Sequence, residues 1–110
     1  MWICTNKGFI SIVRDRDNAE SFIVRARRRE HLKDVLGDVV VIETLHADYR
    51  WRAFIYEQDV VEIVSKHISN IQYDDFKSSV KDEELHDTYL EVWHTVRRMQ
   101  TRKKDMAKLA

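Results

Sequence analysis

Strand-like and helix-like hydrophobic patterns alternate along this chain, and their order constrains the fold more than any other feature of the sequence. Apolar and β-branched residues typical of strands occupy residues 2–14, 21–26, 38–44 and 49–56. Apolar residues at the spacing of a helix occupy residues 27–37, 59–71 and 80–99. The order ββαββαα predicts an α+β fold, in which helices pack on a four-stranded, mostly antiparallel sheet. A ferredoxin-like sandwich or a permuted relative of one has this composition of elements.

Short local signals mark where these elements bend, begin or end. The sequence TNKG at residues 5–8 predicts a bulge or bend inside the first strand. Gly37 stands where a C′ glycine would end the first helix. Ser79 and Asp82 resemble a weak capping box before the last helix. That helix places one apolar stripe on its surface: Leu85, Tyr89, Val92, Trp93, Val96 and Met99.

The chain is short and has no obvious linker. It contains 110 residues, no proline and two glycines, which suits one domain. We predict a single α+β domain over residues 1–99 and a basic C-terminal tail over residues 100–110. The charge is segregated, because residues 57–91 carry ten acidic and three basic side chains and residues 97–110 carry six basic and one acidic. Segregated charge favours association between complementary surfaces.

Composition excludes some classes of site. The formal net charge is zero, so overall electrostatics neither favour nor exclude nucleic acid. Cys4 is the only cysteine, which excludes an intramolecular disulfide and a cysteine-based zinc site. The start of the sequence lacks the basic region and long apolar run of a signal peptide, and no stretch approaches the ~20 apolar residues of a membrane span. We therefore predict a cytoplasmic protein with no membrane partner.

The strand at residues 49–56 combines arginines with aromatic residues. Alternation places Tyr49, Trp51, Ala53 and Ile55 on one face, which we expect to be the core, and Arg50, Arg52, Phe54 and Tyr56 on the other. Arg25 of the second strand would share that other face. These residues could form a platform on which bases stack and phosphates bind. The favoured alternative is that the last helix or a dimer partner covers the face, because exposed apolar area is usually buried somewhere.

Catalytic and metal-binding motifs are weak. The sequence contains no phosphate loop, dinucleotide fingerprint or nucleophile elbow. His46 and Asp48, with Tyr49, Arg50 and Arg52, offer a minor alternative, an acid–base site for metal-independent phosphodiester cleavage. Asp82 and His86 are four residues apart on the last helix, which is only the beginning of a metal site. We predict no catalytic residues, no metal and no cofactor.

Several segments together resemble a group of small uncharacterised bacterial and phage proteins. The segments are MWICTNKGFISIV, VRARRREHL, ADYRWR, IQYDDFK and YLEVWHTV, and they span about residues 1–99. The resemblance implies no activity. It directs attention to Arg25, Arg27, Asp48, Tyr49, Arg52, Tyr73, Phe76 and Lys77. Asp75 stands where Asn is frequent in those proteins, and we expect Asp48 to pair with Arg25 or Arg52.

These observations predict a small, non-catalytic binding protein. A protein partner or self-association is the first interpretation, and a phage or prophage accessory role would suit the resemblance. Single-stranded nucleic acid bound by an Arg/aromatic sheet face is the alternative. The predicted binding residues are Arg25, Arg27, Asp48, Tyr49, Arg50, Arg52, Phe54 and Tyr56.

Overall fold

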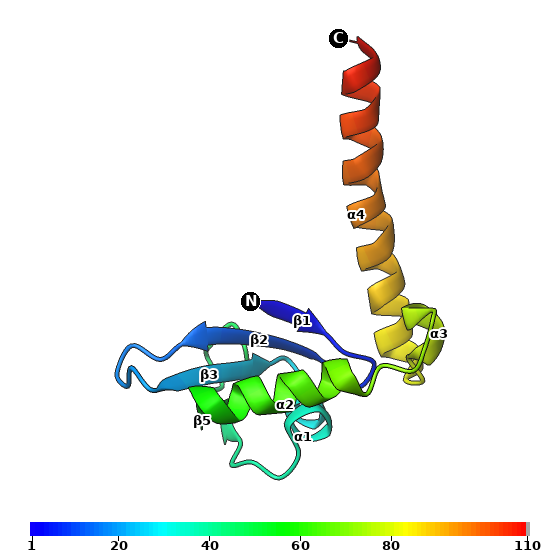
Figure 1. The fold of residues 1–110 in the computed structure, drawn as a ribbon. Helices are drawn as coiled ribbons and strands as arrows, with labels where there is room; N and C mark the ends of the chain where they lie inside the picture. Colours follow the sequence, from blue (N-terminus) through cyan, green and yellow to red (C-terminus); the bar gives the residue numbers. More distant parts are fainter. Residues whose placement is uncertain (110) are drawn as a thin grey trace. The chain divides into compact units, whose positions relative to one another are not determined.

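The computed structural model describes the backbone of residues 1–109 and the side chains of residues 1–102. The chain forms two compact units, residues 1–74 and residues from Asp75 onward, which are described separately. The first unit is a sheet with two helices, and the second is a short helix followed by a long one (Figure 1).

The sheet has five strands, β1 to β5, and every neighbouring pair is antiparallel. Their bounds are Trp2–Cys4, Phe9–Arg14, Ser21–Ala26, Ile42–Glu43 and Trp51–Tyr56, and their order across the sheet is β1-β2-β3-β5-β4. The α+β class and the antiparallel sheet are confirmed. The predicted count of four strands is wrong, and this topology does not confirm the ferredoxin-like order.

The extra strand arises from the segment that we predicted to be one bent strand. Thr5 accepts hydrogen bonds at its hydroxyl from the backbone N–H groups of Lys7 and Gly8, at 3.2 and 3.0 Å, and its own N–H donates to the Gly8 carbonyl at 3.0 Å. These bonds close a tight turn. The turn reverses the chain, so β1 pairs with β2 in place of continuing into it.

The third predicted strand, residues 38–44, is reduced to the two residues of β4. Val39 donates its N–H to the Gly37 carbonyl at 3.0 Å and accepts at its carbonyl from the Lys33 ammonium at 3.0 Å. Val39 and Val41 pack against the core. The segment therefore packs two apolar side chains against the core from a loop, and both backbone groups of Val39 are satisfied without a ladder.

The core lies between one face of the sheet and the helices α1 (Arg29–Leu36) and α2 (Glu57–Ser69), which cover the same side of it (Figure 1). Its buried members are Ile10, Val24, Ala26, Leu32, Val35, Leu36, Ala53 and Val60. Gly37 ends α1 as predicted, with a positive φ of 85° and with its N–H donating to the Lys33 carbonyl at 2.9 Å, but it occupies the C-cap position and not C′.

The second unit contains α3 (Phe76–Ser79) and α4 (Glu83–Leu109). The α4 backbone includes residues 100–109 of the predicted tail. The predicted capping box is wrong in detail, because Asp82 itself caps α4 by accepting from the Leu85 N–H at 2.9 Å. The Ser79 hydroxyl instead donates to the Phe76 carbonyl at 2.6 Å. In the part of the chain described, no helix is both long enough and apolar enough to cross a bilayer.

Candidate binding face of the sheet

The sheet face opposite α1 and α2 carries the candidate site, and we call it the open face. Strand register and side-chain alternation define it. Val24 and Ala53 pair with each other and point into the core, so their strand neighbours point the other way. The open face thus comprises Trp2, Cys4, Phe9, Ser11, Val13, Ser21, Ile23, Arg25, Ile42, Arg52, Phe54 and Tyr56.

One straight cross-strand row runs over all five strands of this face. It consists of Trp2, Ser11, Arg25, Arg52 and Ile42, each paired with the next in the register. A second row contains Val13, Ile23 and Phe54. Arginines lie at the centre of the first row and aromatic residues lie around them.

Arg25 and Arg52 face each other directly across β3 and β5. Arg25 donates from Nη2 to the Ser11 hydroxyl at 2.9 Å. Among the residues described, neither guanidinium has a carboxylate partner, and the Nε atoms of both are buried with no hydrogen-bond partner. Like charges directly opposite each other destabilise a sheet, and a buried donor without a partner costs free energy. The pair is therefore a site that an anion would stabilise.

Tyr49, in the loop before β5, contacts Arg25 of this pair and also Arg27. The Arg25 and Arg27 guanidinium groups lie 4.5 and 4.4 Å from the centre of its ring, and the residue is only 4% exposed. We predicted that Tyr49 would point into the core with Trp51. Tyr49 is buried, as predicted, but it lies outside the core cluster under α1 and α2, because β5 begins at Trp51 and strand alternation does not extend to Tyr49.

Asp48 pairs with Arg27, at 3.2 Å from Nη1 to Oδ1, and its backbone carbonyl accepts from the same nitrogen at 3.1 Å. The expected partners Arg25 and Arg52 are therefore not the ones found. Asp48 therefore neutralises the charge of Arg27, and it leaves Arg25 and Arg52 without a carboxylate partner.

Arg50 does not join the platform that the sequence predicted. Its guanidinium donates from Nε and Nη2 to the Glu43 carboxylate at 3.0 and 2.7 Å, and it lies 5.5 Å from the centre of the Trp51 ring. Because Glu43 pairs with Trp51 in the sheet register, this ion pair belongs to the β4 edge. Arg50 is thus neutralised in place.

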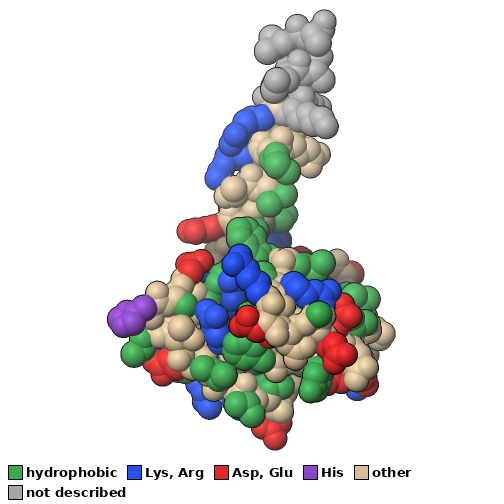
Figure 2. All heavy atoms as spheres, turned by 90° about the vertical axis from the view of Figure 1, so that its left-hand side faces the viewer, with side chains coloured by type: hydrophobic (Ala, Val, Ile, Leu, Met, Phe, Trp, Pro, Cys, Tyr) green, Lys and Arg blue, Asp and Glu red, His purple; other side chains and the backbone are tan. Residues whose placement is uncertain are grey.

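Phe54 and Tyr56 do lie on the open face, and they are 50% and 56% exposed. No described element of residues 1–74 covers them. The covering that we favoured, by the last helix or by a dimer partner, stays a prediction. Figure 2 shows the side of the molecule that carries the β2–β3 turn, where basic, acidic and hydrophobic side chains are interspersed.

Sequence reasoning missed several members of the open face, among them Trp2, Phe9 and Ser11. Trp2 is 73% exposed and its ring lies 6.1 Å from that of Phe9, and Ser11 is the hydrogen-bond partner of Arg25. The alternation of Phe9, Ser11 and Val13 in the sequence was the available signal. It could be assigned to a face only once the register with β3 was known.

The residues of the alternative acid–base site for phosphodiester cleavage interact with different partners and not with one another. Asp48 pairs with Arg27 and Arg50 pairs with Glu43, and no contact joins His46 to Asp48 in the part of the chain described. Cys4 is exposed as a residue, but desolvation of its thiol raises the thiol pKa, which keeps it protonated at neutral pH. The ion pairs of Asp48 and Arg50 therefore do not assemble a general acid and a general base at one site.

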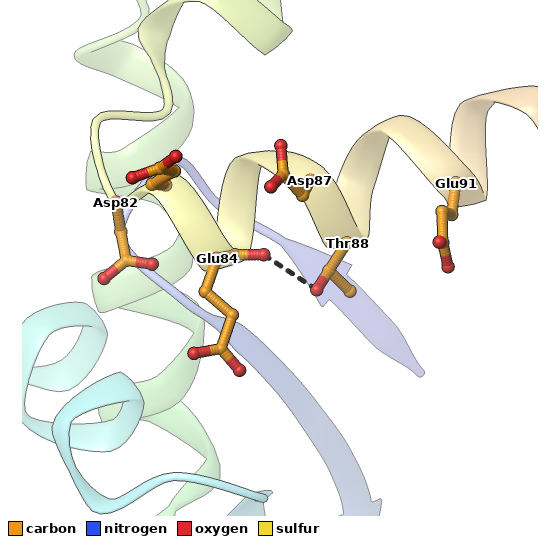
Figure 3. Close-up of a pocket in the computed structure, with 6 residues that line it drawn as sticks. Asp82, Glu84, Asp87, Thr88 and Glu91 are labelled. Atoms are coloured by element: carbon orange, nitrogen blue, oxygen red, sulfur yellow. Dashed lines mark hydrogen bonds between the residues drawn. The ribbon is translucent and has the colours of Figure 1, made fainter.

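The acidic start of α4 lines a shallow surface hollow with Asp82, Glu83, Glu84, Asp87, Thr88 and Glu91. The labelled carboxylates point in different directions (Figure 3). The described residues contain no group of three His, Cys, Asp or Glu side chains that could hold a metal ion. The hollow therefore has no convergent ligand set.

The remaining residues implied by the resemblance belong mostly to the second unit. The Phe76 ring lies 5.4 Å from that of Tyr89, and the Lys77 ammonium lies 4.1 Å from the centre of the Trp93 ring. Asp75 caps α3 by accepting from the Lys77 N–H at 3.2 Å and the Ser78 hydroxyl at 2.6 Å. Asn caps helices as well as Asp does, so either residue can fill this position. Tyr73 lies half-buried in the segment before α3.

Comparison with known proteins gives no relative from which a function could be transferred. No protein-family model matches the chain, and neither a curated protein nor a solved structure matches it.

Proposed function

We propose that this chain is a non-catalytic binding protein and that its open face binds single-stranded nucleic acid. The observation that supports the proposal is the pair formed by Arg25 and Arg52, which lie opposite each other without a carboxylate partner among the described residues. A phosphate group would supply the missing negative charge and would accept hydrogen bonds from both guanidinium groups.

The aromatic residues of the open face favour nucleic acid over an acidic protein segment. Trp2, Phe54 and Tyr56 are each at least half exposed, and every base has a flat face that stacks on such rings. The open face carries no acidic side chain that would repel a phosphate backbone. Arg52 and Tyr56 are four residues apart on one strand, about 13 Å, so a phosphate and a stacked base can be bound together.

Fluorescence anisotropy of labelled single-stranded RNA and DNA, at low and moderate salt, tests the proposal. We expect binding that weakens with salt, because phosphate contacts release counterions. Arg52→Gln should weaken binding by about tenfold and should reduce the slope of log K against log salt by about 0.7. Arg50→Gln is the matched control, because it removes the same charge from an arginine that Glu43 already neutralises.

The outcomes separate the alternatives. Equal effects of Arg50→Gln and Arg52→Gln would show that binding depends on overall charge, and Arg102→Gln would then test the C-terminal half of α4 as the binding segment. Competition by a polyglutamate peptide as strong as that by the oligonucleotide would indicate an acidic protein partner. An absence of binding at low salt would overturn the proposal.

Phe54 offers a second test that does not change charge. We expect Phe54→Ala to weaken binding, since stacking of one base contributes about 1–3 kcal/mol. Phe54→Leu preserves apolar bulk without an aromatic face and should weaken binding to nearly the same extent. Wild-type affinity in the leucine variant would show that the contact is hydrophobic and not a stack.

A further inference from the structure

The apolar stripe of α4 becomes exposed halfway along the helix. Leu85 and Tyr89, near its start, are 5% and 4% exposed. The exposed fractions then rise to 44% at Val92, 55% at Val96 and 68% at Met99. The spacing from Leu85 to Met99 alternates between four and three residues, as in the seam of a coiled coil. Trp93 flanks the seam and is 42% exposed.

The two halves of α4 carry opposite charges. Its start and cap carry Asp82, Glu83, Glu84, Asp87 and Glu91, whereas Arg97, Arg98 and Arg102 lie in its second half. Glu84, Glu91 and Arg98 follow one another at intervals of seven residues, so they lie along the same flank of the stripe. Glu91 and Arg98 are about 10 Å apart along the helix axis, too far for a direct ion pair within one chain.

We infer that α4 binds α4 of a second copy of this chain in antiparallel orientation, with its centre near His94. This arrangement packs Val92 against Val96 of the second copy. It also sets Glu91 level with Arg98 of the second copy, on the same flank of the stripe. A parallel pair would instead place acid beside acid and base beside base, which is destabilising.

A second copy matches α4 better than the other candidates for an amphipathic helix. An anionic membrane or a nucleic acid would attract the arginines but would be repelled by the acidic half of the same helix. Only a partner with the reverse charge order satisfies both halves, and an antiparallel copy has that order. The inference uses none of the residues of the open face, so it does not depend on the proposed function.

Sedimentation velocity of the full chain, from about 1 to 200 µM, measures this association. Four exposed side chains form a small interface, so we expect a dissociation constant of tens of micromolar at low salt. Raising the salt to about 0.5 M should weaken it, because the charged flanks are solvent-exposed. A chain that stays monomeric at 200 µM and low salt would overturn the inference.

A matched pair of valine variants tests the stripe. Val96 and Val61 are both helical and both 55% exposed, but Val61 belongs to α2. We expect Val96→Ser to raise the dissociation constant about tenfold and Val61→Ser to leave it unchanged. Equal effects would place the interface elsewhere.

A charge exchange tests the orientation. Glu91→Lys and Arg98→Glu should each weaken the dimer several-fold, and the double variant should restore it, because each lysine would then face a glutamate of the other copy. A double variant as weak as the single variants would exclude the antiparallel register. Added single-stranded RNA and anionic vesicles serve as competitors: neither should dissociate the dimer, and dissociation by either would overturn the assignment of a second copy.

Discussion

Tyr49 is the residue that connects the fold of the first unit to its candidate site. It is buried, and its ring is contacted by the guanidinium groups of Arg25 and Arg27. Arg25 is in turn held by Ser11 at 2.9 Å. The ring therefore both covers Arg25 and fixes the position of its charge. Packing of the first unit and the proposed recognition therefore depend on the same side chain.

We predict that Tyr49→Ala lowers the free energy of unfolding by about 3 kcal/mol, because it removes a buried aromatic ring and two cation–π contacts. Tyr49→Phe should cost less than about 1 kcal/mol, since the contacts found are made by the ring. Urea denaturation of both variants measures the difference. Equal costs would mean that the hydroxyl, and not the ring, stabilises the cluster.

At the scale of the elements, caps define where the helices of the second unit begin. Asp75 caps α3, and hydrogen bonds from the Ser78 hydroxyl and the Lys77 N–H, together with the Lys77 charge, lower its pKa. A lowered folded-state pKa means that the carboxylate stabilises the fold above its unfolded pKa of about 3.9, and that this contribution is lost as the pH falls through the folded pKa.

Asp75→Asn provides the test of this pH dependence, because asparagine caps a helix without titrating near pH 4. We expect the stability difference between wild type and variant to be constant above about pH 5 and to shift toward the variant below about pH 4. Urea denaturation at a series of pH values from 3 to 6 measures it. Parallel stability curves would show that the pKa of Asp75 is the same in the folded and unfolded chain.

At the scale of the whole molecule, the net charge is close to zero, although acidic and basic residues are segregated into separate segments. The formal net charge is zero and the isoelectric point is about 7.0. Repulsion between molecules is therefore weakest near neutral pH, where segregated patches are free to attract one another.

We predict that light scattering from a concentrated solution is greatest near pH 7 and falls at pH 5.5 and at pH 8.5. Dynamic light scattering at fixed ionic strength measures it. Scattering that does not change with pH would indicate that apolar contacts alone drive association. In that case the charge exchange on α4 would have no effect either.

Parts of the fold that depend on neighbouring residues could be predicted from the sequence. The strand Ser21–Ala26 has the bounds that its composition predicts, and Gly37 ends α1 as its position predicts. The core faces of α1 and α2 follow from helical spacing. Each of these properties is set within a few residues by side-chain size, alternation and backbone conformation.

Parts of the fold that depend on contacts between residues far apart in the sequence could not be predicted from it. The first predicted strand is two strands because Thr5 closes a turn, and the third is mostly a loop because Val39 and Val41 reach the core without a ladder. Residue patterns alone identified Arg25 and Arg52 as candidates. Only strand order and register placed them opposite each other, paired Arg50 with Glu43 and brought Tyr49 to Arg25, because these contacts join segments that local spacing does not relate.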